Sequence, residues 1–71
     1  MGKREYVVED WNGGVVRWLM EYDRDGTVWT LDIHEAKLLM EKEAQLLLMT
    51  HCRNYPGAVM CKLSEVKKWK Q

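Results

Sequence analysis

Two glycine-containing turn signals, Asn12-Gly13-Gly14 and Asp25-Gly26, constrain the fold of this chain more than any other feature. They separate three segments rich in apolar residues, 6–11, 15–22 and 27–31. Asn-Gly and Asp-Gly favour hairpins because these residues tolerate the positive φ angles that a tight turn requires. The first half of the sequence therefore predicts a three-stranded antiparallel meander.

The second hairpin has a register that the pattern itself predicts. If Asp25-Gly26 is a two-residue loop, Tyr22 faces Trp29 and Met20 faces Leu31. One face of the sheet then collects apolar side chains and the other collects charged ones, which a slip of one residue would mix. The expected core set is Val16, Trp18, Met20, Tyr22, Trp29 and Leu31, and the expected charged set is Arg17, Glu21, Asp23 and Asp32.

The first hairpin allows two registers. A three-residue loop, 12–14, with glycine in the left-handed conformation would place Tyr6 and Val8 in the core and Glu9 opposite Arg17. We favour this version, which leaves apolar side chains on the outer face of the sheet. A two-residue Gly13-Gly14 turn is the alternative, and it would place Trp11 in the core.

Residues 32–51 contain no Gly or Pro and are rich in good helix formers. Asp32 and Glu35 match a capping pattern at the start of this region. One continuous helix would place Glu43 near the middle of its apolar face. A short helical turn over about 33–38, followed by a helix over about 40–52, moves Glu43 to the rim, and we prefer this broken version.

The chain turns at Asn54-Tyr55-Pro56-Gly57, because Pro cannot continue a helix and Gly frees the backbone. Alternating apolar residues at 59, 61 and 63 then predict a half-buried fourth strand. The segment 64–71 is expected to be a frayed strand or a short helix capped by Ser64. The sequence thus predicts a single α+β domain over residues 1–71: a small antiparallel sheet in β-β-β-α-β order, with one helix packed on one face.

Composition limits the class of protein. A chain of 71 residues can build one core, and its 46% hydrophobic content is enough to fold it. Eleven basic residues balance eleven acidic ones, yet residues 51–71 hold five Lys or Arg against one Glu. No apolar run approaches the ~20 residues of a membrane span, and the first five residues are too charged for a secretory signal. We expect a cytoplasmic protein with both cysteines reduced.

Neither a metal site nor a catalytic site emerges from the pattern. His51, Cys52 and Cys61 could approach one another, but His34 lies too far along the helical region to supply a fourth ligand. Ser64 has no histidine placed to activate it. We therefore expect no metal, no cofactor and no enzymatic activity.

Two surfaces are candidate binding sites. The outer face of the expected sheet carries apolar side chains among charged ones, which is typical of partner surfaces. The alternative is that the C-terminal segment folds over this face and covers it. The candidate protein-binding residues there are Val7, Trp11, Arg17, Leu19 and Val28. The basic C-terminal segment mixes cations with an aromatic side chain, which suits nucleic acid. Its candidate residues are Lys67, Lys68, Trp69 and Lys70.

The run WTLDIHEAKLL at residues 29–39, followed by Glu43-Ala44, resembles a pattern in small uncharacterised phage and prophage proteins. In those proteins a hairpin ends in Trp and is followed by an acidic residue, an Ala, an aromatic residue and a helix carrying a second Ala. Leu39 stands where the aromatic is usual, and Met40 where a polar helix cap is usual. The resemblance implies a short turn before the helix and an accessory role in a virus or mobile element, and it carries over no catalytic residue. A phage-encoded protein of this kind is expected in the host cytoplasm.

The leading hypothesis is thus a small non-enzymatic binding module, a phage-type accessory protein. It would act through a protein partner, from the host or the virus, or through self-association, with a homodimer as one form. The alternative is a small nucleic-acid-binding accessory protein that uses its basic C-terminal segment.

Overall fold

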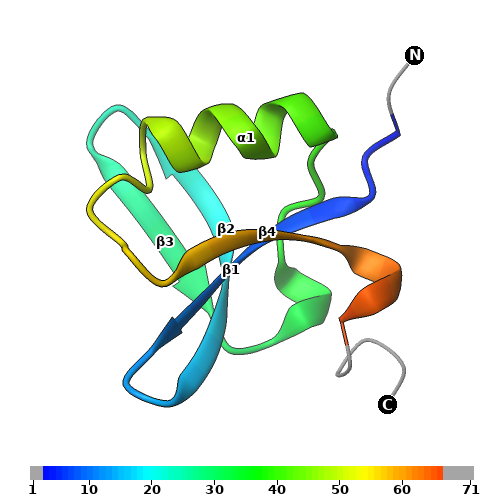
Figure 1. Ribbon diagram of the computed structural model, residues 1–71, viewed down its shortest axis with the longest axis horizontal. Coiled ribbons are helices and arrows are strands. Elements are labelled where there is room, and N and C mark those ends of the chain that lie inside the picture. Colours follow the sequence, from blue (N-terminus) through cyan, green and yellow to red (C-terminus); the bar gives the residue numbers. More distant parts are fainter. Residues whose placement is uncertain (1–2, 67–71) are drawn as a thin grey trace.

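The computed structural model describes residues 3–66, which form a four-stranded antiparallel sheet with one α-helix and two short 3-10 helices (Figure 1). In chain order the elements are β1 (Tyr6–Asn12), β2 (Val15–Asp23), β3 (Gly26–Thr30), η1 (Ile33–Glu35), α1 (Glu41–Met49), β4 (Ala58–Lys62) and η2 (Leu63–Glu65). The strand order across the sheet is β3-β2-β1-β4. The α+β class and the β-β-β-α-β order that the sequence predicts are confirmed.

The β1–β2 hairpin closes through a two-residue turn, Gly13-Gly14, whose φ angles are 68° and 80°. Both angles are positive, which glycine adopts without steric cost. Asn12 pairs with Val15, so Asp10, not Glu9, lies opposite Arg17. The favoured three-residue loop is therefore wrong. The alternative register is right, but it does not bury Trp11, whose side chain is 58% exposed.

The β2–β3 hairpin turns one residue earlier than expected, at Arg24 and Asp25. Asp23 makes this turn, because its Oδ1 atom accepts hydrogen bonds from the backbone N–H groups of Asp25 (2.8 Å) and Gly26 (3.1 Å). Gly26, at φ 154°, then pairs directly with Asp23. The predicted register of this hairpin is wrong, and Tyr22 faces Thr27 instead of Trp29.

A β-bulge between Leu19 and Glu21 changes which side chains of β2 share a face. Before the bulge Trp18 points away from α1, whereas Leu19 and Tyr22 pack on the helix side with Trp29. Of the six apolar residues expected on one face, Tyr22 and Trp29 thus pack on the helix side, whereas Val16 and Trp18 pack on the opposite side. Leu31 lies beyond the sheet and is 68% exposed.

Residues 32–49 form the broken arrangement that the sequence favoured. Asp32 caps η1 by accepting from the N–H of His34 at 2.9 Å. Glu35 does not reach back to the cap, because its Oε1 accepts from the Thr30 hydroxyl at 2.9 Å. The chain then runs extended, and Leu39 pairs with Tyr6 before α1 starts.

Helix α1 begins at Glu41, and its N-cap residue, Met40, has no polar side chain to act as a cap. Glu43 compensates from within the helix, because its Oε1 accepts from the Met40 N–H at 3.1 Å. The same carboxylate pairs with Arg4 at 2.8 Å. Glu43 is therefore half-buried at the rim of the helix, as the broken version predicted.

Strand β4 pairs with β1, with Glu9 opposite Val59 and Val7 opposite Cys61. The predicted fourth strand is confirmed. The chain then enters η2, whose N-cap is Lys62 and not Ser64, so the expected cap is wrong.

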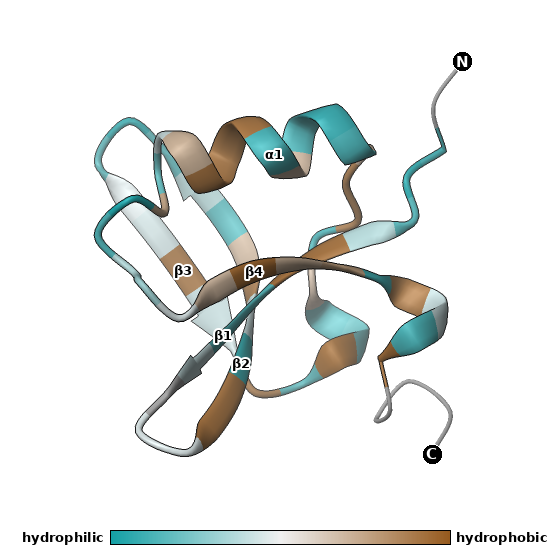
Figure 2. Cartoon of the chain, in the orientation of Figure 1, coloured by the Kyte–Doolittle hydropathy of each residue, from teal (hydrophilic) through white to brown (hydrophobic). Residues whose placement is uncertain are grey.

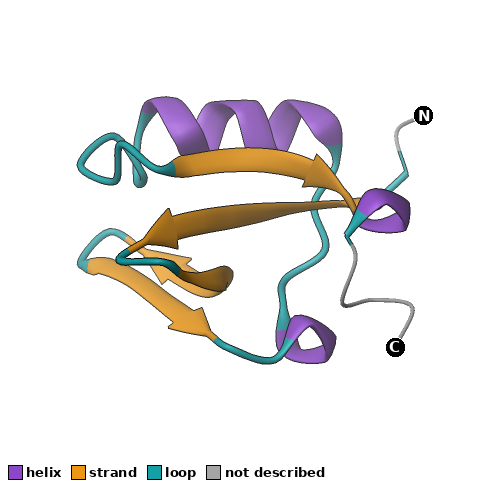
Figure 3. Cartoon of the chain, turned by 60° about the horizontal axis from the view of Figure 1, so that its bottom comes forward, coloured by secondary structure: helices purple, strands orange, loops and turns teal. Residues whose placement is uncertain are grey.

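Both faces of the sheet are covered by apolar side chains. The helix-side cluster, under α1, consists of Val8, Leu19, Leu39, Ala44, Leu47 and Cys52. The second cluster, on the opposite face, consists of Val7, Trp18, Ile33 and Val66. Figure 3 shows α1 along one side of the sheet and η1 on the other. The second face is therefore partly covered, by η1 and by the chain around η2, which agrees in part with the alternative that the C-terminal segment folds over it.

Candidate functional site

A buried carboxylate on the second face is the most unusual polar group in the described structure. Glu9 is 7% exposed, and the two-residue β1–β2 turn places it opposite Trp18. Its Oε2 accepts from the Trp18 indole N–H at 2.9 Å, and its Oε1 accepts from the Trp11 indole N–H and from the Cys61 thiol at 3.7 Å. All these partners donate, which is the arrangement that an ionised carboxylate requires.

The indole of Trp11 is hydrogen-bonded to this carboxylate through its N–H edge, and the Trp11 side chain remains exposed. Because residues alternate along β1, Trp11 shares the face of Glu9, and it pairs across β2 with Val16. Val59, opposite Glu9 on β4, is 44% exposed and lies diagonally from Trp11. Figure 2 shows the hydrophobic start of β2 beside the β1–β2 turn. We call Trp11, Val16 and Val59, with Glu9 beneath them, the Trp11 surface.

The rest of the second face is covered. Ile33 of η1 and Val66 after η2 are buried against Val7 and Trp18, with Ala36 and Leu63 packed around them. Trp11 belongs to neither buried cluster and remains 58% exposed. The second face is therefore divided into a covered half and an accessible half, and the accessible half is the Trp11 surface.

The structure does not bring the five predicted protein-binding residues together. Val7 and Leu19 are fully buried on opposite faces, so their placement on an outer surface is wrong. The bulge in β2 and the 3-10 helices cause this difference. Arg17 lies on the helix side, opposite Asp10, while Trp11 and Val28 are exposed on separate strands. Trp11 keeps the exposure that the hypothesis requires.

Arg17 belongs to a second polar cluster that the sequence analysis missed. Its Nε and Nη2 atoms each lie 2.9 Å from Oδ2 of Asp10, which is 1% exposed. The guanidinium also stacks on two rings, with its carbon 4.9 Å from the Trp29 centroid and 5.6 Å from the Tyr55 centroid. The sequence holds one signal for this cluster, because Asp10 and Arg17 carry opposite charges and lie seven residues apart, on either side of the Gly13-Gly14 turn. This cluster connects β1, β2, β3 and the loop before β4.

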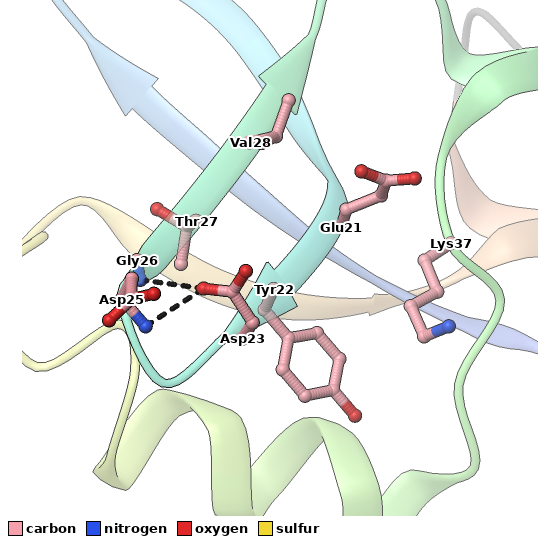
Figure 4. Close-up of a pocket in the computed structure, with 8 residues that line it drawn as sticks. All are labelled: Glu21, Tyr22, Asp23, Asp25, Gly26, Thr27, Val28 and Lys37. Atoms are coloured by element: carbon pink, nitrogen blue, oxygen red, sulfur yellow. Dashed lines mark hydrogen bonds between the residues drawn. The ribbon is translucent and has the colours of Figure 1, made fainter.

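An acidic pocket of ≈ 500 Å³ lies beside the β2–β3 turn (Figure 4). Glu21, Asp23 and Asp25 contribute three carboxylates, and Lys37 contributes one ammonium. Figure 4 shows Lys37 reaching in from the chain after η1, and its Nζ lies 5.8 Å from the centroid of the Tyr22 ring. Asp23 is already used by the turn. The pocket is a net negative region of the surface.

The two cysteines are free thiols that lie on opposite faces of the sheet, Cys52 in the helix-side cluster and Cys61 beside Glu9. Burial, together with the Glu9 carboxylate, raises the pKa of Cys61 from 9.0 to about 11. Burial also raises the pKa of Cys52, with a smaller effect from Asp10. Neither thiol is therefore activated as a nucleophile in this environment. Among residues 3–66, no group of three or more His, Cys, Asp or Glu side chains is placed to hold a metal ion.

The candidate nucleic-acid-binding residues Lys67, Lys68, Trp69 and Lys70 lie outside the described residues, so that hypothesis stays a prediction. A separate basic group, Arg24, His51 and Arg53, lines an open pocket of ≈ 360 Å³ after the end of α1. Within the part of the chain that the structure describes, no helix is long and apolar enough to cross a membrane. No family model, no curated protein and no solved structure matches this chain.

Proposed function

We propose that this protein is a non-enzymatic binding module, a phage-type accessory protein, that binds a partner protein through the Trp11 surface. One observation carries the proposal: Trp11 is 58% exposed, although its indole N–H is bound to a buried carboxylate. A solvent-exposed Trp usually gains little from being held in one orientation. Here the hydrogen bond orients the ring before any partner arrives.

An oriented, exposed Trp is well suited to dominate an interface. Trp is over-represented among the residues that contribute most of the binding energy in protein complexes. A ring that is already ordered loses less conformational entropy on binding than a free one. Val16 and Val59 add apolar area beside the ring, and the covered half of the face gives the surface a rigid border.

The proposal is tested by comparing Trp11→Ala with Leu46→Ala. Leu46 is an exposed apolar residue on α1, away from the Trp11 surface, and serves as the matched control. Both variants and the parent are used as bait in chemical cross-linking and pull-down from the native host, with sedimentation to measure self-association. We expect Trp11→Ala to weaken capture of a partner by more than ~2 kcal/mol, the threshold for a dominant interface residue, and Leu46→Ala to leave it unchanged.

A folded Trp11→Ala variant that captures the same partners as the parent with the same affinity would remove the Trp11 surface from consideration. Loss of dimer formation in the same variant, without loss of any other partner, would identify self-association as the function of the surface. Thermal unfolding of each variant establishes that the fold is retained.

A further inference from the structure

Two adjacent residues of β1 present carboxylates to opposite faces of the sheet, and the two are neutralised differently. Asp10 is paired with the Arg17 guanidinium. Glu9 accepts from two indoles and a thiol, which are all neutral. No Lys or Arg side chain of residues 3–66 forms an ion pair with Glu9. The second face therefore contains a buried negative charge without a counterion from the described chain, and it lies at the N–H edge of the exposed Trp11 ring.

Hydrogen bonding to this carboxylate also changes the Trp11 ring. The face of an indole is the negative part of its quadrupole and attracts cations more strongly than Tyr or Phe does. A donor N–H bound to an anionic carboxylate makes the ring more electron-rich, and it places a full negative charge at the ring edge. A cation on the exposed face of Trp11 is thus attracted both by the ring and by Glu9.

We propose that the Trp11 surface takes an arginine side chain from a partner protein, stacked on the indole and attracted by Glu9. This inference rests on the proposed function and specifies the chemistry of the partner. A planar guanidinium fits better than an ammonium, because it stacks on aromatic faces and is less strongly hydrated. The protein shows the same preference internally, since Arg17 stacks on Trp29 and Tyr55 beside a buried carboxylate.

The charge of the first 50 residues favours the same partner. Residues 1–50 hold ten Asp or Glu against six Lys or Arg. Three of these ten carboxylates line the acidic pocket, which lies at the β2–β3 turn, whereas the Trp11 surface lies at the other end of β2. Complementary charge of this kind steers association and rejects partners of like charge. A basic segment that presents arginine is therefore favoured over an acidic or neutral one.

The test is an NMR titration of the ¹⁵N-labelled full chain with two short peptides, acetyl-Ala-Arg-Ala-amide and acetyl-Ala-citrulline-Ala-amide. Citrulline keeps the planar shape of arginine and lacks its charge. The indole N–H signal of Trp11 is assigned as the one that disappears in Trp11→Phe. We expect the Arg peptide to shift this signal in a saturable manner, and the citrulline peptide to bind at least about tenfold more weakly, within the range of a partly desolvated cation–π contact.

Two matched variants locate the charge responsible. Glu9→Gln and Glu21→Gln each remove one carboxylate, from beneath Trp11 and from the acidic pocket respectively. We expect Glu9→Gln to abolish the preference for arginine over citrulline, and Glu21→Gln to preserve it. Because the Gln amide N–H₂ would face other donors, Glu9→Gln can lose stability. Trp11→Phe is a third variant, followed through the backbone amide signals of residues 11, 16 and 59 because it lacks the indole signal, and it should reduce the preference while retaining an aromatic ring and Glu9.

Equal affinity for the two peptides would overturn the inference, as would a Trp11 signal that stays unmoved while amide signals of the acidic pocket shift. Retention of the arginine preference in both Glu9→Gln and Trp11→Phe would overturn it as well. These outcomes differ from failure of the proposed function. If Trp11→Ala loses a partner but the parent shows no preference for the arginine peptide, the Trp11 surface remains a binding surface and only the arginine ligand is rejected.

Discussion

Arg17 reaches the buried carboxylate of Asp10 through two nitrogens, Nε and Nη2, each 2.9 Å from the same oxygen. The pair joins β1 to β2, and the stacked rings of Trp29 and Tyr55 extend it to β3 and to the loop before β4. Asp10 is 1% exposed, so its charge depends on Arg17 for compensation. The Asp10–Arg17 ion pair thereby links the β1–β2 hairpin to β3 and to the loop before β4.

Removing Arg17 should therefore destabilise the fold strongly. We expect Arg17→Ala to lower the free energy of unfolding by about 3–5 kcal/mol, because it leaves a buried carboxylate without a partner. Urea denaturation measures the loss. The double variant Asp10→Leu/Arg17→Leu should be more stable than Arg17→Ala alone, because it removes both charges. If the free energy of unfolding of Arg17→Ala lies within about 1 kcal/mol of that of the parent, the Asp10–Arg17 ion pair is not essential for stability.

Gly57 lies against the same carboxylate. A Cβ at this position would be 3.0 Å from Oδ1 of Asp10 and 3.4 Å from the backbone oxygen of Trp11. We expect Gly57→Ala to cost about 1–3 kcal/mol through crowding. In an Asp10→Ala background the same substitution should cost clearly less, because the crowded oxygen is gone. Equal costs in the two backgrounds would contradict the close approach of Gly57 to Asp10.

The sequence predicts the elements of this fold better than their registers. The three-stranded meander, the interruption before α1 and the fourth strand follow from turn residues and periodicity, which act locally. The registers depend on which residue makes each turn. At the second turn the Asp23 side chain accepts hydrogen bonds from the N–H groups of Asp25 and Gly26. The Asp25-Gly26 pattern alone does not predict that Asp23 makes the turn.

The candidate site also depends on the register of the β1–β2 hairpin, which the sequence did not predict correctly. With a two-residue Gly13-Gly14 turn, Glu9 meets Trp18 and Asp10 meets Arg17, whereas the three-residue loop puts Glu9 opposite Arg17. The bulge between Leu19 and Glu21 then reverses which face of the sheet the later side chains of β2 point to. Trp11 is the one predicted site residue that remains at the site, because its exposure depends on the open half of the second face. Ile33 and Val66 cover the other half of this face, and they are distant in sequence from the strands that they cover.

The two Trp residues that donate to Glu9 should differ in their importance for stability. Trp18 is almost fully buried, so Trp18→Ala should cost about 3–5 kcal/mol, the range for a large buried aromatic. Trp11→Ala removes one hydrogen bond to a carboxylate and little buried area, so we expect a loss of no more than about 2 kcal/mol. Chemical denaturation of both variants measures the difference. A larger loss for Trp11 than for Trp18 would show that Trp11 serves the core.

The environment of Cys61 predicts a pH dependence of stability. Its pKa in the folded protein is raised from 9.0 to about 11, first by burial and then by the Glu9 carboxylate. Folding therefore favours the protonated thiol. The resulting stabilisation is fully present below pH 9 and is lost as the pH rises through about 11. We expect the stability of the parent to fall more steeply over this window than that of Cys61→Ala, measured by urea denaturation at each pH.

Other groups also titrate above pH 9, including Tyr6, whose pKa is raised by burial and by Glu41. They are present in both proteins, so the difference between the parent and Cys61→Ala isolates the thiol. A kinetic measurement provides an independent check. In the native protein at pH 8, Cys61 should react with a disulfide reagent much more slowly than in denaturant, because thiolate is scarce at a pKa of about 11. Native reactivity equal to that of the denatured chain, together with parallel pH profiles, would show that the Cys61 thiol is not held in its protonated form by burial and Glu9.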